Sequence, residues 1–272
     1  MMIVRSKRQR CLWPSLASLS LLWGIVPLLL IALMAIPASA SEVMIAAASD
    51  LNFAFKELVT EYEKSTGNRV KLSFGSSGNF FSQIQNGAPF DLYFSADIEY
   101  PRKLEEAGLT VLGSLYQYAV GRIVIWTVHE SRVDVTQGFE ALRKATVRKI
   151  AIANPRHAPY GRAAVAALDK AGLYEQLKDR LVYGENISQA AQFVESGAAD
   201  VGIIALSLAL APVMKTKGSY WEVPAEAHPP LEQGAVILKS SKQPESAKQF
   251  LAFIKSVPGQ EIMKRYGFTL PN

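Results

Sequence analysis

The 272-residue sequence predicts a protein of the α/β class. Short apolar runs alternate with amphipathic stretches along most of the chain, which is the pattern of strands followed by helices. Several of the connecting loops are rich in Ser, Gly, Asn and Pro, and no repeat, low-complexity tract or charged tail interrupts the pattern. The roughly 230 residues that follow position 40 can bury a large core, either in one large domain or in two lobes.

Residues 1–40 are predicted to be a cleaved signal peptide. A basic head at Arg5–Arg10 precedes a long apolar run from Leu19 to Ile36, and the small residues Ala38–Ala40 form a signal-peptidase site. Cleavage after Ala40 would release the mature protein into the periplasm. The alternative is an uncleaved membrane anchor, which would make the protein the input domain of a membrane sensor.

Removal of this segment changes the charge of the chain. Four of the 29 Lys and Arg residues are lost with it and none of the 24 acidic residues, which leaves 25 basic against 24 acidic residues. The mature chain therefore gives no reason to expect a nucleic-acid partner. Its single cysteine, Cys11, is lost as well, so the fold depends on a buried core rather than on disulfides.

The first part of the mature chain predicts three strand–loop–helix units. Val43–Ala48 has the composition of a buried strand, and apolar residues then recur at helical spacing from Leu51 to Tyr62, with a helix end at Gly67. The later elements of this part are a strand at Val70–Phe74, a turn at Gly75–Gly78, a helix through Phe81 and Ile84, a strand at Asp91–Ser95 and a helix around Leu104.

The second part repeats this organisation after a long β-rich run at Tyr118–Val128 that Gly121 interrupts. Its predicted elements are a strand at Lys149–Ala153, a loop at Asn154–Tyr160, a helix at Gly161–Ala171, a strand at Leu181–Tyr183, a loop at Gly184–Ile187, a helix at Ser188–Ser196, strands at Val201–Leu206 and Ala235–Lys239, and a helical tail at Glu245–Tyr266 broken at Pro258-Gly259. The runs at 118–128 and 235–239 are the candidates for segments that pass between two lobes.

The residues do not favour an enzyme. His129, His157 and His228 lack metal-ligand spacing, and the chain has neither a G-x-S-x-G elbow nor a Walker loop. We therefore expect no cofactor and no metal-cation site. The alternative is an enzyme that uses Ser77 as nucleophile, although no base is evident beside the serines of the 75–78 turn.

Serine loops at predicted helix starts indicate an anion site instead. Ser49 precedes the first helix, and Ser76 and Ser77 precede the next one. A helix N-terminus leaves backbone N–H groups unpaired and carries a partial positive charge, so it attracts anions. The alternative is that these serines only cap their helices.

Six phrases carry a resemblance to a known family. In chain order they are AAASDL, FGSSGNF, NGAPFDLYFSAD, NPRHAPYG, SGAADVGIIAL and KRYGFTLP. This ordered set, from about Val43 to Pro271, resembles the periplasmic molybdate-binding proteins of ATP-driven (ABC) importers. The resemblance implies the two-lobed periplasmic solute-binding protein fold, in which each lobe is a sheet flanked by helices and hinge strands join the lobes. Lobe I would comprise residues 43–120 and 235–272, and lobe II residues 121–234.

The resemblance also implies the ligand and its partners. Molybdate or tungstate would lie between the lobes of a monomeric protein that delivers it to an importer permease with its ATPase. Ser49 and Ser77 would each bind the oxyanion through hydroxyl and backbone N–H, and Tyr160 and Ile187 through backbone N–H alone. Arg156 and Arg162, which flank the Tyr160 loop, are expected to be surface residues.

Two positions depart from the family pattern. Some members bind the anion with a tyrosine where this chain has Ala205, and a subset has Thr-Asn where this chain has Ser49-Asp50. We expect Asp50 to cap its helix and to offer only its N–H to the ligand, because an ionised carboxylate cannot donate. A carboxylate that pointed inward would repel a dianion and accept a proton from hydrogen phosphate. A phosphate- or sulfate-binding protein is therefore the alternative within the same class.

Overall fold

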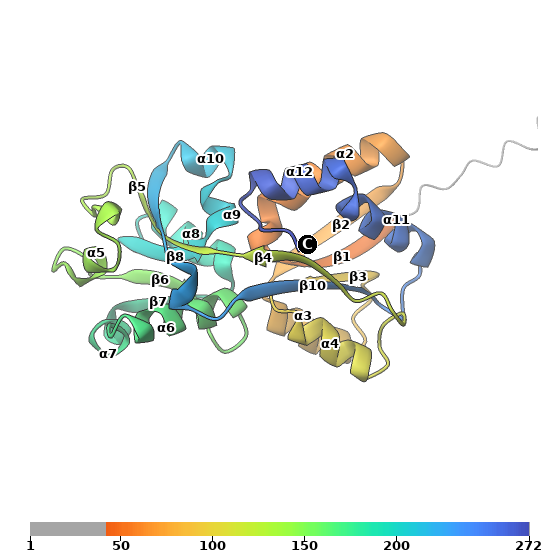
Figure 1. The fold of residues 1–272 in the computed structure, drawn as a ribbon, viewed down its shortest axis with the longest axis horizontal. Coiled ribbons are helices and arrows are strands. Elements are labelled where there is room, and N and C mark those ends of the chain that lie inside the picture. Colours follow the sequence, from red (N-terminus) through yellow and green to blue (C-terminus); the bar gives the residue numbers. More distant parts are fainter. Residues whose placement is uncertain (1–41, 272) are drawn as a thin grey trace, which may run out of the picture. The chain divides into compact units, whose positions relative to one another are not determined.

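The computed structural model describes residues 42–271, which belong to one compact unit. Two five-stranded mixed sheets with flanking helices form this unit (Figure 1), which confirms the predicted α/β class. The predicted signal peptide and Cys11 lie outside the described residues. Within residues 42–271, no helix combines the length and the apolar character needed to cross a membrane.

The first sheet has the strand order β2-β1-β3-β10-β4. β1 is parallel to β2 and β3, whereas β10 is antiparallel to β3 and β4. The strands are β1 (Glu42–Ala48), β2 (Arg69–Gly75), β3 (Leu92–Ser95), β4 (Tyr116–Gly121) and β10 (Leu231–Ile237). The associated helices are the 3-10 turn η2 (Ser49–Leu51), α2 (Asn52–Thr66), α3 (Ser77–Gln85), α4 (Glu99–Glu106), α11 (Pro244–Lys255) and α12 (Val257–Arg265).

Apolar side chains cover both faces of this sheet. Ile45 packs in the same core cluster as Phe55 of α2, whereas its neighbour Ala46 packs in a second cluster with Phe80 of α3. Successive residues of a strand point to opposite faces, so a strand covered by helices on both sides must be apolar throughout. Each fully buried Phe or Leu contributes about 1.5–3 kcal/mol to this packing. The sheet therefore holds the loops at its strand ends firmly in place.

The second sheet has the order β7-β6-β8-β5-β9, in which β6 is parallel to β7 and β8. Its strands are β5 (Ile123–Val128), β6 (Ile150–Ala153), β7 (Leu181–Gly184), β8 (Val201–Ala205) and β9 (Gly218–Glu222). The intervening helices are η3 (Val135–Gln137), α5 (Phe139–Arg143), α6 (Pro159–Lys170), α7 (Tyr174–Leu177), η4 (Lys178–Arg180), α8 (Ile187–Glu195), α9 (Leu206–Ala209), α10 (Pro212–Lys215) and η5 (Ala225–Ala227).

The chain passes between the sheets at β4–β5 and again at β10. The run predicted at 118–128 is two strands in different sheets, separated at Arg122. β10 begins at Leu231, four residues before the predicted start, and its register with β4 shifts between Gln233 and Gly234. Figure 1 shows β4 and β10 side by side where they leave the first sheet. The lobe boundaries at 120/121 and 234/235 stay predictions.

Other differences concern the ends of elements. Helix α6 begins at Pro159, so Tyr160 lies in its first turn rather than in the preceding loop. The tail forms two helices that meet at Ser256, because Pro258 occupies the first turn of α12. Strand β9 was not predicted, since its residues Gly218–Glu222 lack a continuous apolar run.

Candidate functional site

One small cavity brings together all five residues that the sequence singled out. Ser49, Asp50, Ser77, Tyr160 and Ile187 line it, although they come from four separate loops of the two sheets. The other lining residues are Ala48, Gly75, Ser76, Ala96, Ala158 and Pro159. The cavity volume open to the centre of a water molecule is about 10 Å³. A volume of this size corresponds to about one water molecule and is far below the 300 Å³ or more of pockets for larger organic ligands.

Two serine hydroxyls are set up as hydrogen-bond donors at this cavity. The Oγ of Ser77 accepts the backbone N–H of Ala96 at 3.0 Å, and the Oγ of Ser49 accepts that of Ser188 at 3.3 Å. A hydroxyl has one proton to donate, and neither proton is needed for these bonds. Both serines can therefore donate to a guest while the backbone holds their oxygens in position.

Helix N-termini supply further donors. Ser77 is the first residue of α3, Ile187 the first of α8 and Tyr160 the second of α6, and backbone N–H groups at these positions have no acceptor inside the helix. At α8, the Asn186 side chain accepts the N–H of Gln189, which leaves the N–H of Ile187 for the cavity. The three helix starts add partial positive charge without a basic side chain.

Asp50 faces a different set of partners. Its Oδ2 accepts the Tyr160 hydroxyl at 3.0 Å and the Gln233 amide at 2.8 Å, and the side chain is 1% exposed. Burial raises the pKa of the Asp50 carboxyl to about 6, although hydrogen bonds from Gln233, from Tyr160 and from the backbone of Asp50 and Leu51 lower it. Tyr160 and Gln233 thus engage Oδ2, whereas Oδ1 has no hydrogen-bond partner among residues 42–271. The expected cap was wrong, because neither η2 nor α2 begins with a side-chain cap hydrogen bond.

A second polar cluster lies at the rim of the cavity. His157 Nδ1 and Ser76 Oγ are 2.8 Å apart, and the N–H of Gly78 donates to the carbonyl of His157 at 2.9 Å. Glu185 completes the cluster through a hydrogen bond from the Asn79 amide and a 3.7 Å ion-pair contact with His157 Nε2. A Cβ at position 78 would lie 2.7 Å from the His157 carbonyl oxygen, so glycine permits this close approach.

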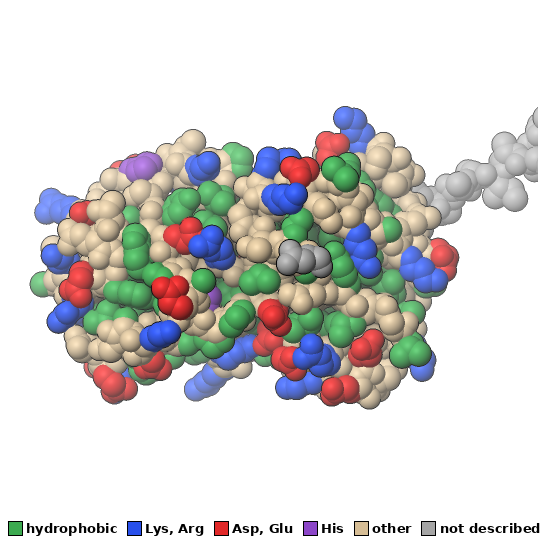
Figure 2. All heavy atoms as spheres, in the orientation of Figure 1, with side chains coloured by type: hydrophobic (Ala, Val, Ile, Leu, Met, Phe, Trp, Pro, Cys, Tyr) green, Lys and Arg blue, Asp and Glu red, His purple; other side chains and the backbone are tan. Residues whose placement is uncertain are grey.

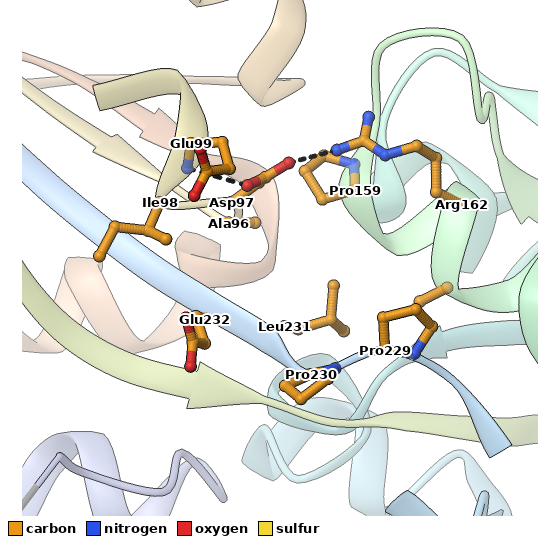
Figure 3. A pocket seen from close by; sticks show the side chains of 11 residues that line it. Ala96, Asp97, Ile98, Glu99, Pro159, Arg162, Pro229, Pro230, Leu231 and Glu232 are labelled. Carbon is orange, nitrogen blue, oxygen red and sulfur yellow. Dashed lines mark hydrogen bonds and ion pairs between the residues drawn. The ribbon is translucent and has the colours of Figure 1, made fainter. Parts of the chain in front are cut away.

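Arg162 lies beside the site in a larger cavity of about 350 Å³, which shares Ala96 and Pro159 with the small one. Figure 3 shows the guanidinium directed to Asp97, with which it forms an ion pair. It also lies over the Tyr100 ring at 5.7 Å. Arg162 is partly buried, and its charge is compensated by Asp97 rather than directed to the small cavity. Arg156 is exposed, as expected.

Several residues that hydrogen-bond to the cavity residues were not predicted from the sequence. The hydroxyl of Ser188 donates to the carbonyl of Ser49 at 2.8 Å, and that of Ser207 to the carbonyl of Asp50 at 2.7 Å. Gln233 carries no motif signal at all. Ala205 is buried at the end of β8 and does not line the small cavity. Position 205 therefore supplies no side-chain donor to the cavity.

Neither the charges on the face shown in Figure 2 nor the acidic residues at positions 42–271 indicate a nucleic-acid or metal-ion site. Basic and acidic side chains are interspersed on the face shown in Figure 2, without a basic stripe of the kind that binds nucleic acids. Among residues 42–271, no three His, Cys, Asp or Glu side chains come together as a metal-ion site.

Relatives of the chain carry the names of binding proteins. It is 43% identical to the molybdate-binding protein ModA of Azotobacter vinelandii, over 88% of this chain and 94% of the relative. It is 40% identical to that of Rhodobacter capsulatus, over 90% and 95%. The solved structure of the periplasmic molybdate-binding protein from Azotobacter vinelandii matches with a TM-score of 0.80 at 37% identity, covering 85% of this chain and all of that one.

These matches confirm the two-lobed fold that the resemblance implied, because the paired five-stranded sheets superpose on a protein of that fold over its full length. They also favour a binding protein over an enzyme, since these relatives are named as molybdate-binding proteins. The family model for bacterial extracellular solute-binding proteins matches residues 43–269, nearly the whole described chain. The chain belongs to the bacterial extracellular solute-binding protein family.

Proposed function

We propose that this protein binds molybdate or tungstate in the small cavity and delivers it to an ABC importer. The observation that carries the proposal is the convergence of uncharged donors from four loops on one small cavity. The names of the relatives at 40% and 43% identity support the same ligand. The protein would act by binding and release, without covalent chemistry and without a cofactor.

The ligand residues of the proposal are Ser49 and Ser77 through hydroxyl and N–H, and Asp50, Tyr160 and Ile187 through N–H. Each hydrogen bond to an ionised acceptor contributes about 1.5–3 kcal/mol. About seven such bonds, reduced by the costs of desolvation and lobe closure, correspond to micromolar or tighter binding. No counter-charge is required, because the donors replace the hydration shell of the anion.

The donor set favours a fully deprotonated guest. Hydroxyl and N–H groups can satisfy the oxygens of a dianion, whereas hydrogen phosphate also needs an acceptor for its own proton. Asp50 could serve as such an acceptor only through its carboxylate, whose Oδ2 already accepts from Tyr160 and Gln233, whereas the buried Oδ1 has no hydrogen-bond partner among residues 42–271. The uncharged donors support molybdate or tungstate over phosphate, and calorimetric titration tests the discrimination against the smaller sulfate.

Binding would couple to transport through closure of the lobes. We place lobe I at residues 43–120 and 235–272 and lobe II at 121–234. Gly121 and residues 231–234 form the hinge segments at these boundaries, where β4 and β10 pair. A ligand held by both lobes favours the closed form. The importer permease with its ATPase would recognise that form of a monomeric, periplasmic protein. N-terminal sequencing of the exported protein tests cleavage after Ala40, because an anchored protein would retain the earlier residues.

Calorimetric titration of the mature protein with molybdate, tungstate, sulfate and phosphate tests the proposal. We expect micromolar or tighter binding of the first two. The Ser77→Ala variant should bind about 10- to 100-fold more weakly, because it loses one bond to a charged acceptor. Ser82→Ala is the matched control, since Ser82 is exposed on the same helix. Tight phosphate binding without molybdate binding would contradict the proposal.

A further inference from the structure

Three buried polar side chains form a cluster between the ligand loops and the hinge strands. The amide Nε2 of Gln233 donates to Asp50 Oδ2 at 2.8 Å and to the Tyr160 hydroxyl at 3.0 Å, and this hydroxyl donates to the same Asp50 oxygen. None of the three residues is more than 2% exposed. The amide must present its nitrogen here, because its oxygen would face a carboxylate oxygen.

The members of this cluster come from three different parts of the fold. Asp50 follows Ser49 in the loop after β1, and Tyr160 lies in the first turn of α6 over the second sheet. Gln233 lies in β10 at the irregularity in its pairing with β4. One set of hydrogen bonds therefore links a ligand loop of each lobe to a strand that connects the lobes.

Gly121 marks where this cluster meets the other connecting strand. It is the last residue of β4, and a Cβ added to it would lie 2.2 Å from the Tyr160 hydroxyl oxygen and 2.6 Å from Gln233 Nε2. The backbone of Gly121 does not have the positive φ that favours glycine. Position 121 is therefore small to make space for the Tyr160 hydroxyl rather than to permit an unusual backbone conformation.

Tyr160 connects this cluster to the cavity. Its side chain ends between Asp50, Gln233 and Gly121, while its backbone N–H lies in the first turn of α6 at the cavity. Burial also raises the pKa of the Tyr160 hydroxyl well above its usual value, so the group remains a donor. A displacement of the hydroxyl would move the N–H away from an anion in the cavity.

We propose that Gly121 and Gln233 are positioning residues for oxyanion binding, which together form a socket that receives the Tyr160 hydroxyl when the lobes close. The socket fixes the closed arrangement at the hinge and thereby sets the Tyr160 N–H at the anion. This role rests on the proposed function. The hinge would then stabilise the closed form through the contacts that Gly121 and Gln233 make with the Tyr160 hydroxyl. Neither contact involves the ligand.

Molybdate titration of four proteins tests the socket: wild type, Gly121→Ala, Tyr160→Phe and the double variant. Gly121→Ala should bind at least about tenfold more weakly, because its Cβ occupies the place of the hydroxyl. Tyr160→Phe should bind about 3- to 30-fold more weakly through loss of the anchor. The double variant should bind more tightly than Gly121→Ala, because the oxygen 2.2 Å from the added Cβ is gone. The 2.6 Å approach to Gln233 Nε2 remains, so the double variant should still bind more weakly than Tyr160→Phe.

Two controls keep the outcomes distinct. Gln117→Ala alters the same strand away from the cluster and should bind as wild type does, and thermal unfolding shows which variants fold. Small-angle scattering with molybdate should show a closed form for wild type and a more open one for Gly121→Ala.

Two results would overturn the socket alone: a Gly121→Ala variant with wild-type affinity, or a folded double variant that binds molybdate no more tightly than Gly121→Ala. If Gly121→Ala does not fold, wild-type affinity in Tyr160→Phe would overturn it. Failure of the wild type to bind molybdate, tungstate, sulfate or phosphate would overturn the proposed function and the socket with it.

Discussion

Two polar clusters connect the lobes, and they differ in how much water reaches them. The hinge cluster of Asp50, Tyr160 and Gln233 is buried, whereas the rim cluster includes Glu185, whose side chain is 57% exposed. Both clusters consist of a carboxylate with hydrogen-bond donors from the opposite lobe. Water screens the charges of the rim and can replace its partners, but it cannot do so at the hinge. A hydrogen bond in the hinge cluster should therefore contribute severalfold more to the free energy of unfolding than a similar bond at the rim.

The largest effect expected from this difference is a pH dependence of the free energy of unfolding, caused by the Asp50 carboxyl. Its folded-state pKa is raised from 3.8 to about 6, so the native protein holds the proton more tightly than the unfolded chain does. Stability is therefore fully present at acid pH and falls as the pH rises from about 4 to about 6. From pH 4 to pH 7 this loss amounts to about 2–3 kcal/mol for a fully buried group.

The Asp50→Asn variant isolates this effect, since asparagine keeps the shape but not the charge. Urea unfolding of both proteins across this pH range should show the variant gaining about 2–3 kcal/mol relative to wild type, most of it by pH 6. Other titrating groups cancel in the difference. A difference that stays constant with pH would mean that the carboxylate is not desolvated.

Removal of one partner from the hinge cluster should have the next largest effect. Gln233→Leu leaves the buried Asp50 carboxylate with Tyr160 as its remaining side-chain donor. We expect the ligand-free protein to lose about 1–3 kcal/mol at neutral pH, because a buried acceptor loses a bond that water cannot replace. Urea unfolding measures this loss, and it should shrink below pH 5, where Asp50 is protonated. An equal loss at every pH would assign the effect to packing alone.

Loss of the ion pair between Arg162 and Asp97 should have an effect of intermediate size, because the two side chains are 40% and 27% exposed. Arg162→Ala should weaken molybdate binding about two- to fivefold at low salt, with a smaller effect at high salt. The exposed Arg156 provides the matched control as Arg156→Ala. If both variants lost the same affinity, a general loss of positive charge would explain the result better than a contact across the lobes.

The smallest effect is expected at the rim. Glu185→Gln removes the charge opposite His157 but keeps an acceptor for Asn79. We expect stability to change by less than about 0.5 kcal/mol and affinity by less than about twofold. Calorimetry and urea unfolding on this variant measure both quantities. A change as large as that of Gln233→Leu would remove the distinction between the two clusters.

The sequence predicted the loops that line the small cavity better than the residues that support these loops. The loop that carries Ser49 follows the largely buried strand β1, and the loop that carries Ser77 follows the partly exposed strand β2. Both loops precede amphipathic helices, and this local periodicity determines where helix N-termini meet a sheet edge. Gln233 was missed because a lone polar residue in an apolar strand carries no periodic signal. Its role depends on β10 pairing with β4 from more than a hundred residues away.

The crossing at 118–128 shows the same limit. Both β4 and β5 are β-rich, so composition alone does not reveal that Arg122 separates strands of different sheets. Gly121 was noticed only as an interruption, and its requirement for space follows from the Tyr160 hydroxyl, which belongs to helix α6 beside the second sheet. Contacts between lobes are set by tertiary structure rather than by local pattern.

The most direct test of the oxyanion site is a crystal structure of the mature protein with molybdate, with anomalous scattering used to locate the metal. We predict one strong peak in the small cavity, with oxyanion oxygens about 2.7–3.0 Å from the hydroxyls of Ser49 and Ser77. A peak in the larger cavity beside Arg162, or a loaded protein without a peak between the two serines, would contradict the account.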